Sequence, residues 1–238
     1  MSRQKIILFI VEGTTDEDAL SGILKKLFQN NLIKFAIVRS DITIAPGIST
    51  KNCKKRINEV VEQYSSTYKV NKNDICEIVH LVDTDGCYID KAWVFKSPND
   101  EKSYQLNGIY AIDPEKMIER NQLKSRILNC ILGMKELTFD KNKVKIPYSI
   151  FYFACNLEHV LHDLPNAPRE DKEALADVFS DSYEGREVAF LDFITNSDFA
   201  VSGNYRETWD FIQNDLHSLE RHTNFGVYLM QNDKICKD

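Results

Sequence analysis

Residues that interrupt regular structure are scarce in this sequence. Its 238 residues include only 9 glycines and 6 prolines, and it contains neither an internal repeat nor a low-complexity segment. The apolar run before Glu12 is far shorter than the roughly 18 apolar residues that cross a membrane, and it is too short for the core of a signal peptide. These absences exclude fibrous, disordered, secreted and membrane-spanning proteins. We therefore expect a globular protein of the cytoplasm that has no membrane partner.

The sequence also lacks an excess of positive charge and a paired cysteine motif. Lys and Arg number 30 against 36 Asp and Glu, which gives a net charge of −6. Without a global positive field, a polyanion such as nucleic acid would have to bind through a local basic patch or a metal ion. The six cysteines form no C-x-x-C pair, and a chain of this length folds without disulfides, so we interpret them as reduced thiols.

The first third of the chain alternates between strand and helix patterns. Apolar, β-branched runs predict strands at Lys5–Val11, Phe35–Arg39 and Ile75–Val82. Apolar residues at helical spacing predict helices over Thr15–Phe28 and Lys54–Tyr64, between those strands. A β-α-β-α-β order is typical of a parallel sheet with right-handed crossovers, flanked by helices. The fold class is therefore α/β.

The rest of the chain contains fewer strands and more helix. Asp113–Leu132 predicts a helix with proline at its first position. Tyr148–Cys155 predicts another buried strand, and Ile109–Ile112 and Asn224–Leu229 predict short ones. Arg169–His222 has a mostly helical pattern. The sequence thus predicts a helical C-terminal region after the α/β core.

Acidic residues follow three of the predicted strands. The first strand is followed by Glu12 and Asp16, the third by Asp83 and Asp85, and the late aromatic strand by Glu158. Ligands of an open parallel sheet bind beyond the carboxyl ends of its strands, so these side chains could converge on one rim. Asp83 and Asp85 are two positions apart and would share a face of an extended chain. Because crowded carboxylates repel each other, and because oxygen ligands suit hard cations, the pattern predicts a site for Mg²⁺ or Mn²⁺.

Two of these motifs resemble those of the TOPRIM domain. That family has a strand followed by Glu-Gly, here Glu12-Gly13, and a later strand followed by Asp-x-Asp, here Asp83 and Asp85. The form V-E-G-T-T-D-E-x-A-L is most similar to OLD-type TOPRIM nucleases and RloB-like phage-defence proteins. The resemblance implies metal-dependent cleavage of phosphodiester bonds in DNA or RNA, and a role in phage defence.

The resemblance also implies a role for each acid. Glu12, Asp83 and Asp85 would be the catalytic residues and metal ligands, with Glu12 available for general acid–base chemistry. Asp16 and Glu158 would complete a second metal site; Glu158 follows an asparagine in a context similar to the late acidic motif of the family. The chemistry attributed to the metal is neutralisation of the phosphate and activation of water.

The domain organisation follows from the same pattern. We expect a TOPRIM-like core over 1–165, with an insertion near 87–110, and a helical region over 166–238 that packs on the core. The motifs do not reach this C-terminal region. The sequence has no G-x-x-x-x-G-K-[ST] motif, so an ATPase partner of the OLD type would be a separate chain.

Basic residues that could contact nucleic acid are less clearly marked. Lys54, Lys55 and Arg56 form a short basic run that could meet a phosphate backbone, although such runs are often merely solvated. TOPRIM nucleases of this type also use a lysine near the metals. Lys91 and Lys116 are candidates that no motif singles out.

Two other functions remain open at this stage. The segment ending in Asp83-Thr84-Asp85-Gly86 resembles the first motif of haloacid-dehalogenase-like phosphatases, in which Asp83 would be the nucleophile and Asp85 the general acid–base residue. Two strand–helix units precede this motif, however, whereas in that family it ends the first strand of the core. Alternatively, the chain is a non-catalytic TOPRIM-shaped binding or partner subunit.

Overall fold

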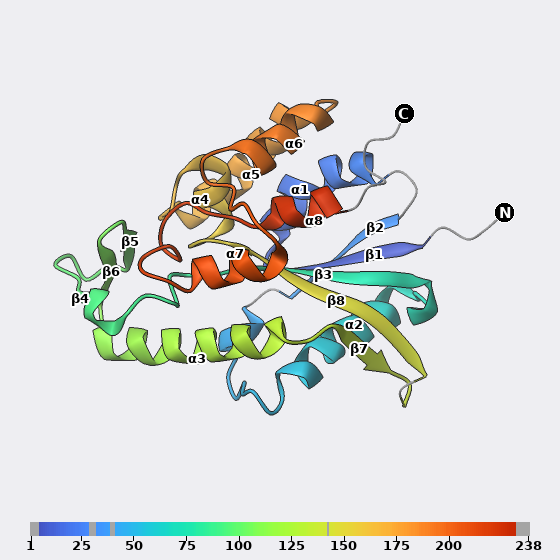
Figure 1. The fold of residues 1–238 in the computed structure, drawn as a ribbon, viewed down its shortest axis with the longest axis horizontal. Coiled ribbons are helices and arrows are strands. Elements are labelled where there is room, and N and C mark those ends of the chain that lie inside the picture. The colour runs from blue at the N-terminus through green and yellow to red at the C-terminus, as the bar shows by residue number, and fades with distance from the viewer. Residues whose placement is uncertain (1–4, 29–31, 39–40, 142, 232–238) are drawn as a thin grey trace.

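Five strands form one mixed sheet in the order β2-β1-β3-β8-β7 (Figure 1). The structure is a computed structural model that describes residues 5–28, 32–38, 41–141 and 143–231. The strands of this sheet are β1 (Ile6–Val11), β2 (Leu32–Ile37), β3 (Ile75–Asp83), β7 (Glu136–Phe139) and β8 (Val144–Phe153). The pairs β1–β2, β1–β3 and β3–β8 are parallel, and only β7 is antiparallel to its neighbour. The expected α/β fold with a mainly parallel sheet is confirmed.

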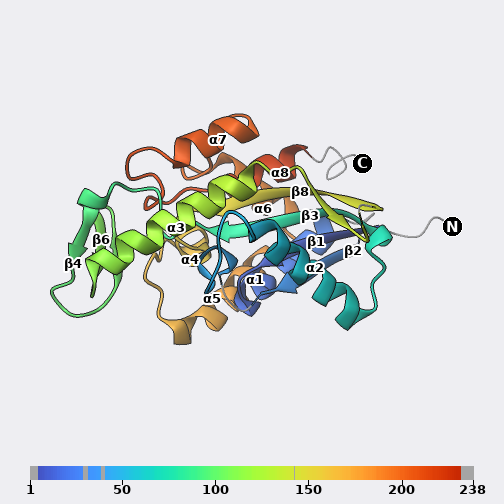
Figure 2. The same cartoon turned by 90° about the horizontal axis from the view of Figure 1, so that it is seen from below.

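Helices cover both faces of this sheet. They are α1 (Thr14–Leu27), α2 (Cys53–Tyr68), α3 (Pro114–Leu132), α4 (Leu157–His162), α5 (Lys172–Tyr183), α6 (Glu187–Asn196), α7 (Tyr205–Ile212) and α8 (Phe225–Gln231). α2 and α3 lie on one face, and α1, α5, α6 and α8 on the other (Figures 1 and 2). Successive side chains of β1 point alternately to the two faces of the sheet. Leu8 and Ile10 belong to the core on one face, and Phe9 and Val11 belong to the core on the other. Burial on both faces explains why the β1 sequence is apolar throughout.

A second, smaller sheet projects from one end of the molecule. Its strands β4 (Val94–Lys96), β6 (Gly108–Ala111) and β5 (Ser103–Gln105) lie side by side in that order, at the end of the molecule opposite β2 (Figure 1). A small core that includes Tyr104, Ile109 and Leu219 holds it against the rest of the chain. α3 contacts β4 and β6 at one end and β8 at the other, so this helix links the small sheet to the main one.

The C-terminal region is hydrogen-bonded to the ends of β3 and β8. The buried hydroxyl of Thr84 donates to the carbonyl of Ser218 (2.8 Å) and accepts from the amide of Cys155 (2.9 Å). The amide of Ala154 donates to the carbonyl of His222 (2.8 Å). The turn that follows Asp83 is therefore fixed from two directions.

Most predicted elements are confirmed, and one is wrong. The strands β1, β3 and β8 and the helices α1, α2 and α3 lie where the sequence pattern puts them, whereas residues 39 and 40 fall outside the described part of the chain. Asn224–Leu229, expected as a strand, begins helix α8 instead. Its buried residues Phe225, Tyr228 and Leu229 have the i, i+3, i+4 spacing of a helix face. Across the described ranges, no helix is long and apolar enough to cross a membrane.

Candidate functional site

The first wall of the site is built where β1 passes into α1. Gly13 is the N-cap of the helix, and the carboxylate of Asp16 reaches back to it. Asp16 Oδ2 accepts hydrogen bonds from the backbone amides of Glu12 (3.1 Å) and Gly13 (3.0 Å). Burial raises the pKa of Asp16 to about 6, although these two hydrogen bonds oppose the shift. Asp16 therefore caps the N-terminus of α1 through one carboxylate oxygen, and the same oxygen fixes the backbone of Glu12.

Glu12 and Asp83 face one cleft from the ends of two adjacent parallel strands. The cleft has a volume of about 850 Å³, and Asp16 and Asp41 also line it. Among the described residues, neither Glu12 nor Asp83 makes a hydrogen bond or an ion pair through its carboxylate. Burial raises the pKa of Glu12 to about 8 against the opposing charge of Lys124, and the neighbouring carboxylates add to the rise. Burial, and then the neighbouring carboxylates, raises the pKa of Asp83 well above its usual range. Two acids that are costly to ionise together thus share an open cleft.

Asp85 is close to these acids but is directed elsewhere. The backbone turns sharply after β3, because Asp85 and Gly86 have positive φ values of 50° and 66°. The expectation that Asp83 and Asp85 share a face of an extended chain is therefore wrong. Of the two, only Asp83 lines the cleft.

The carboxylate of Asp85 is fully engaged by donors. Its Oδ2 lies 2.5 Å from Arg120 and 2.5 Å from Lys124 Nζ, and its Oδ1 accepts from the hydroxyl of Tyr104 at 2.8 Å. Burial alone would raise the pKa of Asp85, but the charges of Lys124 and Arg120 outweigh burial and hold this pKa well below its usual range. Asp85 is therefore a permanent anion that holds a cluster of donors in place.

Lys124 is the least expected residue of the site. Its side chain is 0 % exposed, and its ammonium group also pairs with Asp41, the N-cap of the short 3₁₀ helix Ile42–Ile44. Burial would lower the pKa of Lys124, but the acids around it raise this pKa well above its usual value, so the group is charged. The sequence contains one signal of its burial. Lys124 precedes Ile127 by three residues and Leu128 by four, which places it on the apolar face of α3 that packs into the core.

Glu158 lies beside the cleft rather than within it. Asn156 caps helix α4 by accepting from the amide of His159 (2.9 Å), which places Glu158 in the first turn. The Glu158 side chain is only 7 % exposed, and its Oε1 lies 2.8 Å from Lys172 Nζ. Lys172 also lines the main cleft, together with Arg169. The sequence pattern indicates Glu158 but not its partner, which comes from the C-terminal region.

The expected basic residues lie away from this cleft. Lys54, Lys55 and Arg56 are exposed in the first turn of α2, and Lys55 and Arg56 each pair with Glu59. They form a basic patch on the surface but do not line the cleft. The basic side chains that line the cleft are instead those of Arg169 and Lys172, which no sequence motif marked.

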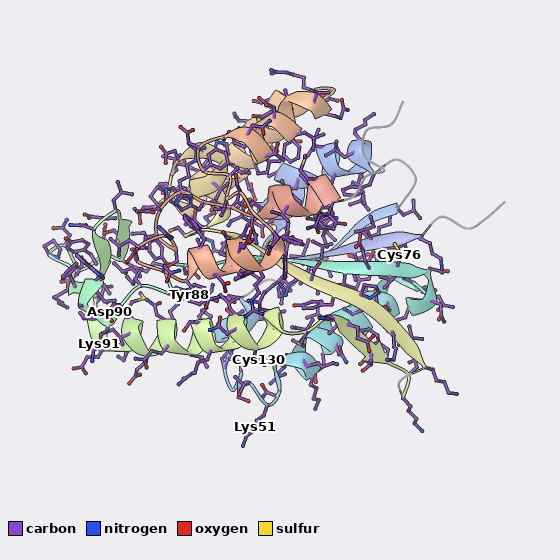
Figure 3. All side chains as sticks on the ribbon, in the orientation of Figure 1. Lys51, Cys76, Tyr88, Asp90, Lys91 and Cys130 are labelled. Atoms are coloured by element: carbon purple, nitrogen blue, oxygen red, sulfur yellow. The ribbon has the colours of Figure 1, made fainter. Side chains whose placement is uncertain are left out.

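The two lysines considered near the metals are also distant from the acids. Lys91 is exposed beside the small sheet (Figure 3). Lys116 is exposed in the first turn of α3 and pairs with Asp113 (3.0 Å). Neither lines the cleft, whereas Lys172 does and Lys124 is held between Asp41 and Asp85.

The donor set fits one hard divalent cation better than two. Glu12 and Asp83 offer oxygen ligands without a competing partner, and their raised pKa values show the electrostatic cost that a cation would relieve. The other predicted ligands are engaged: Asp16 with backbone amides, Asp85 with Lys124 and Arg120, Glu158 with a lysine. Accordingly, the described part of the chain contains no group of three or more His, Cys, Asp or Glu side chains arranged to hold a metal ion.

Comparison with known proteins adds no assignment to this geometry. No protein-family model matches the chain, and no curated protein or solved structure is significantly similar to it. The function has to be argued from the residues that form the cleft.

Proposed function

We propose that this protein is a TOPRIM-type nuclease that cleaves phosphodiester bonds of DNA or RNA with Mg²⁺ or Mn²⁺. The observation that supports it most is the pair Glu12 and Asp83: two carboxylates without partners among the described residues, at adjacent strand ends, in a cleft large enough for a nucleotide. A mainly parallel sheet flanked by helices is compatible with the TOPRIM fold.

The cleft combines the chemistry that such a reaction needs. A cation bound by Glu12 and Asp83 would neutralise the phosphate and lower the pKa of bound water. The pKa of Glu12 near 8 belongs to the metal-free site, where this carboxyl is mostly protonated at neutral pH; a bound cation would hold Glu12 ionised as a ligand. Lys172 and Arg169 line the same cleft and would face the phosphate oxygens. The amino-terminal end of α1 lines it too, and the dipole of this helix favours an anion.

The phosphatase alternative fits the geometry less well. It requires Asp85 to deliver a proton as the general acid. The three donors on Asp85 stabilise its ionised form, so this residue holds no proton to give at neutral pH. Asp85 is better suited to position Lys124 and Arg120.

The direct test is cleavage by the purified protein. We expect cleavage of single- or double-stranded DNA or RNA with Mg²⁺ or Mn²⁺ and none with EDTA. Asp83→Asn and Asp83→Ala should abolish it, because each removes a metal ligand. Asp181→Asn, which changes an exposed acid on α5, is the matched control and should leave the rate unchanged.

Two outcomes would favour the other functions. Release of phosphate from a phosphomonoester, with no cleavage of nucleic acid, would support the phosphatase. Neither activity, with full biological activity retained by Asp83→Ala, would support a non-catalytic partner or binding subunit.

The cellular context is part of the proposal. A nuclease of this type would act in the cytoplasm, in phage defence, with nucleic acid as its partner. The exposed run Lys54, Lys55 and Arg56 would contact the backbone of the substrate. Any ATPase partner would be a separate chain.

A further inference from the structure

We propose that the cleft holds a single divalent cation, on Glu12 and Asp83, and that the ammonium group of Lys172 takes the place of a second one. This inference rests on the proposed function and specifies the cation content of the same site. It also assigns a role to the C-terminal region, which the sequence motifs do not reach.

The ion pair between Lys172 and Glu158 already neutralises one of the expected metal ligands. Lys172 Nζ lies 2.8 Å from Glu158 Oε1, and the two side chains are 34 % and 7 % exposed. A buried carboxylate needs a positive partner, and this one already has it. A metal at Glu158 would first have to displace the ammonium group.

Asp16, the other ligand expected at a second metal, is occupied by the backbone. Its Oδ2 accepts two backbone hydrogen bonds that define the start of α1. Turning this oxygen toward a metal would leave the amides of Glu12 and Gly13 without their acceptor. Both ligands expected to complete a second metal site are thus committed to groups of the protein itself.

The positive charge of Lys172 also acts on carboxylates other than its ion-pair partner Glu158. It interacts with Asp83 and Asp16 as well as with Glu158. Lys172 therefore already supplies positive charge to the same three acids that a second cation would neutralise. A dication brought there would meet a fixed positive charge in a partly buried cleft, where repulsion is weakly screened.

Lys172 also stands where it can act on a substrate. It lines the cleft with Glu12 and Asp83, and Arg169 lies one turn earlier in the chain on the same wall. An ammonium group has three N–H donors and can hold a carboxylate and a phosphate oxygen at once. The C-terminal region would then supply the positive charge, and the sheet would supply the metal ligands.

The test counts the Mn²⁺ ions that the full chain binds in the absence of substrate. The count is measured by electron paramagnetic resonance of the free Mn²⁺ and, independently, by calorimetry. The wild type should bind one ion. Lys172→Gln should bind two, because Glu158 and Asp16 Oδ1, which accepts neither of the two backbone hydrogen bonds, both lose their positive neighbour. Adding Glu158→Gln, which keeps the shape of that side chain, to Lys172→Gln should return the count to one.

A matched control is the surface pair of Lys145 and Glu136, whose Nζ–Oε1 distance is also 2.8 Å. Lys145→Gln should leave the count at one. Two ions on the wild type, or one ion on Lys172→Gln, would overturn the assignment of Lys172 while leaving the metal-dependent nuclease intact. No Mn²⁺ on any variant would instead overturn the proposed function.

Discussion

Lys124 Nζ and Asp85 Oδ2 are 2.5 Å apart in the interior of the protein, although 39 residues separate them in sequence. The pair connects the middle of α3 to the turn after β3. Because Lys124 has no exposure to solvent, its charge depends on the acids around it, first Asp85 and Asp41 and then Glu12. Removing Lys124 takes the ammonium group from Asp41 and leaves Asp85 with Arg120 and Tyr104, so two largely buried carboxylates lose a positive partner.

Lys124→Met should therefore destabilise the fold strongly. We expect a loss of about 3–5 kcal/mol in the free energy of unfolding, measured by urea denaturation. Lys145→Met, which breaks an exposed pair, should cost less than about 1 kcal/mol. Equal losses in the two variants would show that Asp41 and Asp85 find other partners when Lys124 is absent.

Glu12 should make the stability of the metal-free protein fall with rising pH, whereas His80, His159, His162 and His222, whose pKa values burial lowers, act in the opposite direction below about pH 6.5. The pKa of Glu12 is 4.5 in its ordinary state and about 8 in the folded protein. Between these values the folded state holds a proton that the unfolded state has lost, so unfolding becomes easier up to about pH 8. The raised pKa values of Asp16 and Asp83 act in the same direction.

Melting temperatures from pH 5 to 9 check this expectation. Mn²⁺ binds the ionised carboxylates, so the stabilisation it provides should grow over the same range. Glu12→Gln should flatten the metal-free profile, whereas Glu62→Gln, an exposed change on α2, should not. Wild type and Glu12→Gln profiles that run parallel between pH 6.5 and 8 would contradict the raised pKa of Glu12.

Gly86 should tolerate no side chain. Its φ is 66°, and a Cβ placed there would lie 2.4 Å from Leu219 Cδ2. Gly86→Ala should therefore combine left-handed backbone strain with overpacking and cost about 2–4 kcal/mol in unfolding experiments. Gly185 has a similar φ of 65° but open space around it, so Gly185→Ala isolates the backbone contribution, about 1 kcal/mol. Similar losses at both positions would remove the steric explanation.

The basic patch of α2 can be tested through salt dependence. Changing Lys54, Lys55 and Arg56 together to Gln should weaken nucleic-acid binding and reduce the slope of log K against log salt. The reduction should be about 0.7–0.9 for each phosphate that the variant no longer neutralises. Fluorescence anisotropy of a labelled oligonucleotide, with Asp83→Ala as background to prevent cleavage, measures both quantities.

The control for this patch removes the same charge elsewhere. Lys25, Lys26 and Lys34 are exposed residues of α1 and β2, and changing all three to Gln alters the net charge equally. A slope that shifts by the same amount in both triple variants would indicate a general charge effect and not a binding patch.

Cys53 and Cys130 are the thiols most ready to cross-link. Their sulfur atoms are 3.3 Å apart, between the start of α2 and the end of α3. Burial, and then the neighbouring thiol, raises the pKa of Cys53 to about 11, so diamide should join the two faster at alkaline than at neutral pH. The reaction forms one S–S bond and transfers two hydrogens to diamide.

Peptide mapping by mass spectrometry without reduction identifies the pair. Cys53→Ser should prevent the cross-link, and Cys76→Ser, at the far end of the molecule, should not (Figure 3). The described cysteines are free thiols in the structure, as expected for reduced residues, and Cys236 lies outside the described part. Cross-linking that persists in Cys53→Ser would contradict the geometry.

Local patterns were enough to predict the main elements of the fold. The buried strands are largely apolar. The capping residue Asp113, which accepts from the amide of Lys116, and Pro114 at the first position of α3 define the start of this helix. The edge strand β7 and the short strands β4 and β5 carry too few residues for a period to show. Helix α8 was mistaken for a strand because a mostly apolar run of six residues fits either period.

The site was predictable where a motif lies at a strand end and not where it depends on tertiary contacts. Glu12 and Asp83 were found because parallel strands bring their carboxyl ends to one edge. Asp85 was misread because the left-handed turn after β3 is not visible in the sequence. Lys124 and Lys172 were missed because their partners lie at sequence separations that local patterns cannot bridge.

The hydrogen bonds between Thr84 and the backbone near Ser218 and Cys155 have a practical consequence for experiments on this protein. A chain shortened at the end of the expected core would lose the backbone that supports the turn bearing Asp85, and Lys172 along with it. Inactivity of such a truncation would then report a collapsed turn rather than a missing accessory domain. Dissection of this molecule is better done by single side-chain replacements than by deletion.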